Sequence, residues 1–301
     1  MAYDNFIPEV WEHKIEHDLS NICVYVEDCN RKYEGSVQKC GDTVHILGSG
    51  KPTIYTLARE NADGDINGPE TPQGSDTTLV IDQIRYFNFK EGDIDKAQAV
   101  DGVLDELTLE ANEGLADEVD KYLSRLHLNV QSTVEEDEDG NKVETITAAT
   151  PVEGVAKTEQ LALTKDNVLD LLDAGRVILL KHNVRATTEI VTVLPPEAET
   201  LFRRAYMKED TNNHEEMKNG KVGKYANITV KVSNNVPMVQ DGTYHTQMKT
   251  KRAMAYAQPK RHVEAYRPEK GFADAVKGFI LFGAKITRPA EIVDMVFKLA
   301  A

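Results

Sequence analysis

The chain has 301 residues, of which 35 are Lys or Arg and 50 are Asp or Glu, so its formal net charge is −15. A protein this acidic is not expected to bind nucleic acid without sequence preference, because such binding needs cations that displace the counterions of phosphate. A mean hydropathy of −0.45, with no apolar run of about 18 residues, predicts no membrane span. The beginning of the sequence also lacks the basic and then apolar pattern of a secretory signal.

The charge is distributed unevenly along the chain. Residues 101–140 contain 13 acidic and 2 basic residues, whereas residues 201–301 contain 18 basic and 10 acidic residues. Both regions could simply face water, which is the usual role of charge runs. They could also meet between copies of the chain, because complementary potentials steer association and fix its register.

The first hundred residues predict one helix and several strands. A proline followed by helical apolar spacing predicts a short amphipathic helix over 8–19. Strands are predicted at 43–47, 53–57 and 79–89. The residues between them, 59–78, are rich in Gly, Pro, Asn and Asp, which favour turns. Strands joined by about 20 polar residues predict a long extended hairpin, which a compact domain rarely keeps unless it has a function or reaches for a partner.

The clearest helix is predicted over 103–126, where apolar residues recur at spacings of three and four. At 1.5 Å per residue this helix would be about 36 Å long, which is unusual for a globular domain. Its other flank is almost wholly anionic and includes Glu106, Glu110, Glu113 and Asp117.

The second half of the chain predicts a mixture of helices and strands, without an internal repeat. The predicted elements are a hairpin over 129–149, a helix over 164–183 with Thr164 as its N-cap, a strand at 191–194, a helix that begins at Pro195-Pro196, a charged loop over 208–224, and strands at 228–232, 252–257 and 279–286.

One short motif suggests a metal site. His13, Glu16 and His17 match the H-x-x-E-H pattern of inverted zinc hydrolases, in which two His side chains bind Zn²⁺ and the Glu acts as general base. Three fixed positions out of five arise easily by chance, and no third ligand is indicated. A metal-dependent hydrolase is therefore the alternative from a different functional class, and it is not favoured.

Other motifs are incomplete. The stretch 63–68 matches the first half of an EF-hand loop, but Gly74 stands where the bidentate Glu is required. Residues 48–53 resemble the end of a phosphate-binding loop, but Pro52 replaces the required Ser or Thr. The three cysteines (Cys23, Cys29 and Cys40) form no C-x₂-C pair and are odd in number, which favours a reducing compartment. We predict that the chain is not an enzyme and has no cofactor.

Several segments occur in an order that is familiar from one family. They are residues 1–11, 26–30, 33–35, 41–44 and 50–54, then 183–184, LPP at 194–196 and SNNV at 233–236, and finally AYRP at 265–268 with 272–278, 283–285 and 288–289. In this order they resemble the major capsid proteins of tailed bacteriophages, which have the Hong Kong 97-type fold. The resemblance runs over most of the chain.

The resemblance implies an α+β fold with five parts. These are an N-terminal arm (1–45) that crosses a neighbouring subunit, an extended β-hairpin loop (46–98) that lies over the adjacent subunit, a first part of a peripheral domain (99–159) with a spine helix (101–128) and a hairpin (129–150), an axial α/β domain (160–250), and a second part of the peripheral domain with the C-terminus (251–301).

The resemblance also implies a function and partners. Copies would form the pentamers and hexamers of an icosahedral shell around double-stranded DNA, in the virion and, during assembly, in the host cytoplasm. Because the sequence starts with arm-like residues, assembly is expected to need a separate scaffolding protein or a different trigger, together with a portal and, as an option, a decoration protein. Residues 59–84 contain no Lys, so we expect no covalent cross-links between subunits. An encapsulin-like cargo shell of the same fold remains the alternative.

Candidate contacts between subunits follow from these regions. They are Phe6 and Trp11 in the arm, Arg59, Asp63, Asp65 and Arg85 in the loop, Glu106, Glu110, Glu113 and Asp117 on the acidic helix, and Arg203, Arg204, Lys251, Arg252 and Arg267 in the basic last third. Two roles remain open for the acidic helix: it could face DNA inside the shell, or it could pair with the basic third of a neighbour.

Overall fold

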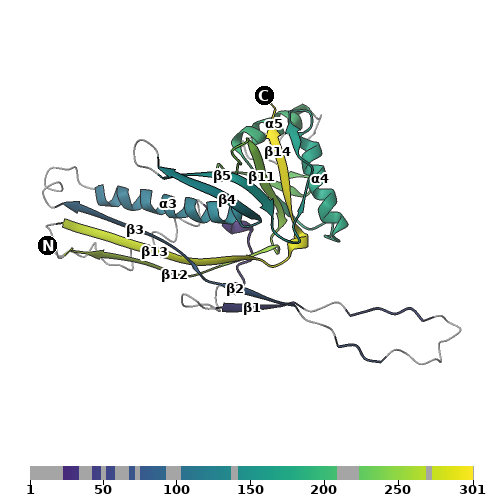
Figure 1. The fold of residues 1–301 in the computed structure, drawn as a ribbon, viewed down its shortest axis with the longest axis horizontal. Helices are drawn as coiled ribbons and strands as arrows, with labels where there is room; N and C mark the ends of the chain where they lie inside the picture. The colour runs from purple at the N-terminus through teal and green to yellow at the C-terminus, as the bar shows by residue number, and fades with distance from the viewer. Residues whose placement is uncertain are drawn as a thin grey trace.

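A computed structural model of the chain describes residues 23–33, 43–48, 52–57, 68–71, 75–92, 103–136, 142–208, 224–268 and 273–300. The molecule is elongated (Figure 1). A long helix and long strands lie at one end, a second sheet with two helices lies at the other, and a thin arm projects beyond the second sheet.

The elements follow one another in a mixed order of α and β. The first part contains η1 (Val26–Asp28), β1 (Thr43–Gly48), β2 (Ser75–Val80), β3 (Gln83–Gly92), α3 (Val103–Arg125), β4 (Leu128–Glu136) and β5 (Lys142–Pro151). The middle contains β6 (Ala156–Lys157), β7 (Leu161–Leu163), α4 (Val168–Lys181), β8 (Ile190–Leu194), α5 (Pro196–Lys208), β9 (Lys224–Tyr225) and β10 (Ile228–Val232). The last part contains β11 (Thr243–Thr250), β12 (Met254–Tyr266), β13 (Ala273–Ile286), η4 (Pro289–Glu291) and β14 (Ile292–Leu299).

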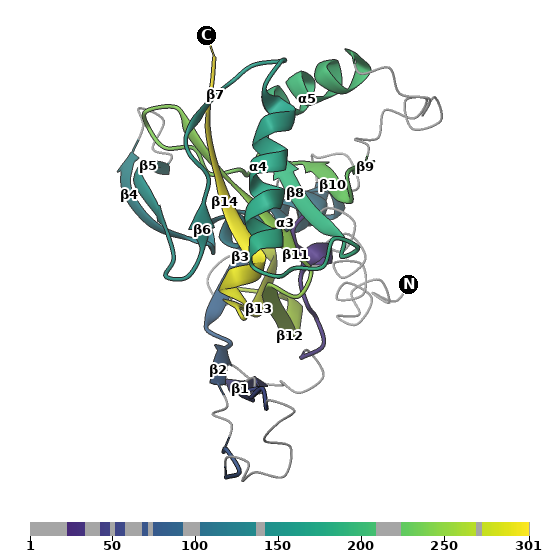
Figure 2. The same cartoon turned by 90° about the vertical axis from the view of Figure 1, so that its right-hand side faces the viewer.

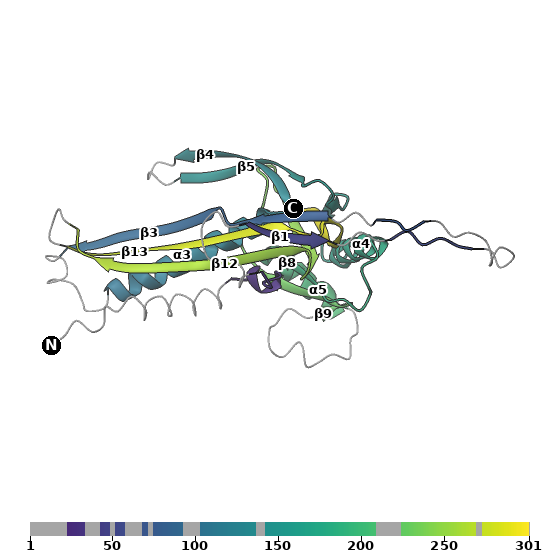
Figure 3. The same cartoon turned by 90° about the horizontal axis from the view of Figure 1, so that it is seen from below.

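Helix α3 lies along the antiparallel sheet β12-β13-β3 (Figure 3). Its apolar stripe, which includes Leu115, Val119 and Leu123, is buried in a core shared with β12 and β13. The ring of Tyr122 meets the ring of Phe282 edge to face, with 5.4 Å between their centroids. Burial of each such apolar side chain contributes about 1.5–3 kcal/mol, so the helix is held by its periodic face rather than by its exposed acidic flank.

A second sheet has the strand order β6-β14-β11-β8-β10-β9, with β7 also paired to β14. Alternate residues of β14 face opposite sides: Met295 and Phe297 lie in a core with α4 and α5, whereas Ile292 lies in the core shared with α3. Helix α4 lies against β14 in Figure 2. Because both faces are covered, every residue of the central strand β8 is buried.

The hairpin β4–β5 leaves the end of α3 and is largely exposed. Strand β5 is tied to the rest of the chain by a hydrogen bond from the backbone N–H of Gln240 to the carbonyl of Ile146 (2.8 Å) and by an ion pair between Arg125 and Glu144 (2.6 Å). A two-stranded hairpin alone is marginally stable in water, so contact with another surface would add to its stability.

Several predicted elements are confirmed. The helix expected at 103–126 is α3, the hairpin expected at 129–149 is β4–β5, the strand expected at 191–194 is β8, the helix expected at Pro195-Pro196 is α5, and the strand expected at 228–232 is β10. The strands expected at 252–257 and 279–286 form parts of the longer β12 and β13.

Other predictions are wrong or cannot be checked. Helix α4 begins at Val168 with Asn167 as its N-cap, because the Asn167 side chain first closes a turn by accepting a hydrogen bond from the Thr164 backbone N–H (2.6 Å). Residues 53–57 form no strand ladder. The strand expected at 79–89 is divided into β2 and β3 by the buried Ile81 and the exposed Asp82. The helix expected at 8–19 and all but the ends of the loop expected at 208–224 lie outside the described residues.

Gly283 marks a close crossing of β2 and β13 and yields a stability prediction. A β-carbon at this position would collide with the carbonyl oxygen of Val80 and lie 2.9 Å from Cδ1 of the buried Ile81. Gly283→Ala should therefore lower the free energy of unfolding by about 1–3 kcal/mol, as overpacking does elsewhere. Gly114→Ala is the matched control, because nothing lies within 4 Å of the added carbon and Ala favours helix α3 by roughly 1 kcal/mol. Urea unfolding of both variants measures the difference, and effects of the same sign would contradict it.

Candidate intersubunit surfaces

The thin arm consists of the hairpin β1–β2 and the segments 52–57 and 68–71 beyond it (Figure 1). Strands β1 and β2 pair antiparallel from Thr43↔Val80 to Gly48↔Ser75. Beyond them, Thr53 donates two hydrogen bonds to the carboxylate of Glu70, from its backbone N–H and from its hydroxyl (both 3.0 Å). These bonds join the two sides of the arm.

The arm carries apolar side chains that its own chain does not cover. Ile54 is 91% exposed, Tyr55 61% and Leu57 50%. Grouped exposed apolar side chains of this size are characteristic of a binding surface rather than of ordinary solvent-facing chain.

The acidic flank of α3 has free and bound carboxylates. Glu110 and Glu113 are exposed, and within the described part of the chain neither forms an ion pair. Asp117 is different, because it accepts hydrogen bonds from Lys121 and Asn235 (both 2.6 Å). Burial opposes ionisation of Asp117, but these two bonds lower its pKa below the ordinary value.

Two arginines share one buried carboxylate near the turn between β11 and β12. Nη2 of Arg252 lies 3.2 Å and Nη1 of Arg288 3.0 Å from Oε1 of Glu291. The hydroxyl of Thr250 donates to the other oxygen of the same carboxylate. Both arginine side chains remain more than half exposed, so one negative charge fixes two positive charges at the surface.

The remaining candidate residues lie in separate places. Arg203 and Arg204 are exposed on α5, Lys251 is exposed beside Arg252, and Arg267 is exposed and pairs with Asp274 (3.0 Å). Arg85 lies on β3 and is directed toward α3, where its Nε is 3.6 Å from Glu118. Glu106 belongs to α3, but its side chain is not described, and Phe6, Trp11, Arg59, Asp63 and Asp65 lie outside the described residues. The structure therefore brings Lys251 and Arg252 together and does not join them to the acidic flank within one chain.

A buried polar cluster at the junction of the two sheets has no counterpart in the sequence predictions. Nδ1 of His245 lies 2.9 Å from one oxygen of Asp294, and Nε2 of His127 lies 3.4 Å from the other. Asp294 and His127 are fully buried. Burial alone would raise the pKa of Asp294, but the two imidazoles hold it below the ordinary value.

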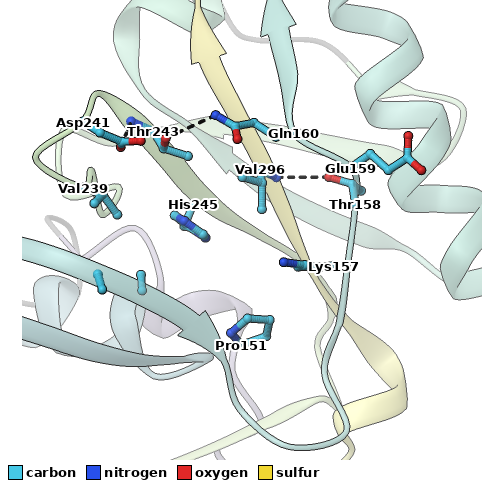
Figure 4. A pocket seen from close by; sticks show the side chains of 12 residues that line it. Pro151, Lys157, Thr158, Glu159, Gln160, Val239, Asp241, Thr243, His245 and Val296 are labelled. Atoms are coloured by element: carbon cyan, nitrogen blue, oxygen red, sulfur yellow. Dashed lines mark hydrogen bonds between the residues drawn. The ribbon is translucent and has the colours of Figure 1, made fainter.

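His245 also lines a cleft of about 530 Å³ between the base of hairpin β4–β5, residues 157–160 and the turn at 239–243 (Figure 4). Two hydrogen bonds fix its wall, from Gln160 to Thr243 (3.3 Å) and from the Val296 backbone N–H to Thr158 (3.1 Å). The histidine nitrogen nearest Asp294 is already bonded, and the other lining side chains offer no nucleophile with an adjacent base. The described lining of this cleft therefore contains no catalytic arrangement of side chains.

Asp120 on α3 produces a testable pH dependence. It is buried and accepts hydrogen bonds from the backbone N–H groups of Val24 (2.9 Å) and Tyr25 (3.3 Å). Burial raises the pKa of Asp120 to about 6, although these two bonds work in the opposite direction. The folded state therefore binds the proton of Asp120 more tightly than the unfolded state does. The contribution of this proton to the free energy of unfolding, roughly 3 kcal/mol, is present below about pH 4 and is lost as the pH rises to about 6.

Urea unfolding of the unaltered chain and of Asp120→Asn between pH 4 and pH 7 tests this dependence. The difference in unfolding free energy between the two proteins should change with pH across that window. A difference that is the same at every pH would show that the Asp120 carboxyl does not titrate as stated.

The motifs considered for metal binding receive no support from the structure. His13, Glu16 and His17 lie outside the described residues, as does most of the EF-hand-like stretch 63–68. Within the part of the chain that is described, no group of three or more His, Cys, Asp or Glu is placed to hold a metal ion. None of the described helices is both long and apolar enough to cross a membrane.

Comparisons with known proteins give a consistent result for the fold. No protein-family model and no curated protein sequence matches the chain. Among solved structures, a protein of Mycobacterium phage Che8 matches with a TM-score of 0.70 and 22% identity, over 91% of this chain and 90% of that one. The mature capsid of bacteriophage PhiM1 matches with a TM-score of 0.59 and 14% identity, over 89% and 87%.

A virus-like particle from Pyrococcus furiosus also matches, with a TM-score of 0.56 and 10% identity, over 95% of this chain and 98% of that one. At these identities the likeness shows the fold, and it covers nearly all of each chain. The chain therefore has the α+β Hong Kong 97-type capsid fold of tailed-bacteriophage major capsid proteins, which its sequence resembles.

Proposed function

We propose that the chain is the major capsid protein of a tailed bacteriophage. Its copies assemble into pentamers and hexamers, which close an icosahedral shell around double-stranded DNA. The observation that carries this proposal is the thin arm with three exposed apolar side chains, on a fold shared with capsid proteins. An arm that buries little of its surface against its own chain is best explained by a neighbouring copy that covers it.

We assign the parts of the fold to roles on the same basis. Residues 1–45 act as the N-terminal arm and 46–98 as the extended loop. Residues 99–159 and the strands β12 and β13 form the peripheral domain, with α3 as its spine helix, and residues 160–250 form the axial domain. Because β14 pairs with β11, the end of the region 251–301 contributes to the sheet of the axial domain.

The proposed role is structural rather than enzymatic, and it requires no cofactor. The partners are other copies of the chain, a separate scaffolding protein, a portal and, as an option, a decoration protein. The protein acts in the shell of the virion and is assembled in the host cytoplasm.

An encapsulin-like cargo shell of the same fold is the alternative, and it is not favoured, because the Che8 phage protein is more similar to this chain than the virus-like particle of Pyrococcus furiosus is. The contents of particles isolated from the producing cells separate the two functions. We expect double-stranded DNA that resists nuclease until the shell is opened. Particles that contain a single enzyme and no protected DNA would contradict the phage capsid and support the cargo shell.

A further inference from the structure

Five exposed basic residues belong to segments that come together around η4 and the turn between β11 and β12. Arg252 and Arg288 are fixed on Glu291, Lys251 precedes Arg252, Lys285 lies three residues before Arg288, and Lys181 ends α4. The end of α4 is joined to this place by a hydrogen bond between Nδ1 of His182 and the carbonyl of Ala290 (3.0 Å). We call these residues, Lys181, Lys251, Arg252, Lys285 and Arg288, the cationic patch.

Within the part of the chain that the structure describes, one carboxylate, that of Glu291, is paired with the cationic patch. All five side chains are exposed. Among the described residues, no ion pair joins Lys181, Lys251 or Lys285 to a carboxylate, and Glu291 is shared by both arginines. Like charges held close together repel one another, so an anionic surface that approached the patch would be attracted strongly.

The acidic flank of α3 has the complementary character. Glu110 and Glu113 lie three residues apart and therefore on one side of the helix, and both lack an ion pair in the described part of the chain. The two surfaces cannot meet within one molecule. Fifteen residues of helix, about 22 Å, separate Glu110 from Arg125 at the end of α3, and the segment between β13 and β14 lies beyond that end (Figure 1).

We propose that the cationic patch binds the acidic flank of α3 of a second copy, with Glu110 and Glu113 facing Lys251 and Lys285. This inference rests on the proposed function, because it names one contact by which copies associate. Two different surfaces of the same chain meet in such a contact, so it is heterologous, and repetition of it generates a ring or a closed shell. Complementary charge fixes which neighbour is accepted and in which register.

Charge exchange tests the contact directly. Lys251→Glu with Lys285→Glu, and separately Glu110→Lys with Glu113→Lys, should each reduce the yield of assembled particles at least about tenfold, because like charges then face each other. Both pairs of changes in one chain restore the attraction and should return the yield to within about twofold of the unaltered protein. Sedimentation and electron microscopy measure the yield, and circular dichroism checks that each variant is folded.

Matched controls place the same charge changes elsewhere. Lys90→Glu with Lys165→Glu alters two exposed lysines outside the patch, and Glu135→Lys with Glu136→Lys alters two exposed carboxylates of β4. The lysine control should not restore particle yield when it is combined with Glu110→Lys and Glu113→Lys. The β4 control should not restore it when it is combined with Lys251→Glu and Lys285→Glu. Rescue by the β4 variant would overturn the choice of α3 as the occupant.

Three outcomes distinguish a failure of the proposed contact from a failure of the proposed function. If the unaltered protein assembles and the patch variants assemble equally well, the inference is wrong and the proposed function stands. If the patch variants assemble but retain less nucleic acid, the patch binds phosphate and the inference is also wrong. If the unaltered protein remains monomeric at every salt concentration, the inference and the proposed function fail together.

Discussion

Replacing residues 49–74 by Asn-Gly is expected to give a folded chain that forms no particles. Gly48 and Ser75 pair at the end of β1–β2, so a two-residue turn can close the hairpin there without changing its register. The change removes Ile54, Tyr55 and Leu57, which are exposed in the single chain. If a neighbour covers them, each contributes about 1.5–3 kcal/mol to the contact, and a shell repeats that contact in every subunit.

Sedimentation of the shortened chain and measurement of its thermal unfolding test this prediction together. We expect a particle yield reduced to background and an unfolding temperature close to that of the full chain. Ile54→Ser with Leu57→Ser should weaken assembly in the same direction, whereas Thr56→Ser, at the exposed position between them, should not. Normal particles from the shortened chain would show that the arm is not an assembly element.

Asp294→Ala is expected to be the most destabilising single substitution at a polar site. It would remove the carboxylate oxygen that is hydrogen-bonded to Nδ1 of His245 (2.9 Å) and the one that lies 3.4 Å from Nε2 of the buried His127. Loss of one partner of a buried ionic cluster costs about 3–5 kcal/mol, because the groups that remain are desolvated and unpaired. The pKa of Asp294 is depressed in the folded state, so its contribution is present above the unfolded value near 4 and is lost as the pH falls through the folded value.

Urea unfolding at neutral pH measures the effect of Asp294→Ala. Asp294→Asn is the matched control, since it retains one oxygen acceptor and nearly the same volume, and it should cost less than the Ala variant. A loss below about 1 kcal/mol for Asp294→Ala would mean that the cluster contributes little to stability.

Local patterns were sufficient to predict the elements that depend on them. The apolar spacing of three and four predicted α3 within one residue of its end at Arg125, and Gly140-Asn141 predicted the hairpin β4–β5. Strand β14 was missed, although its run IVDMVFKL is nearly continuous in apolar residues, because Asp294 interrupts it. That interruption is explained only by His127 and His245, which are distant in sequence.

The sequence indicated only those residues of the two charged surfaces that lie in local runs of one charge. The anionic flank of α3 and the cations Lys251 and Arg252 are visible as runs of one charge. Lys181, Lys285 and Arg288 were not selected, because three different elements bring them to the patch. Arg85 was selected for its position in the loop region, and the structure instead directs it to Glu118 of its own chain.

Electron microscopy of the purified protein shows whether copies of this chain build a closed shell. Negative-stain images, with sedimentation of the same sample, should show rings of five or six subunits or closed particles of uniform diameter. A well-folded protein that stays monomeric across concentration and ionic strength would show that the chain is not a shell protein.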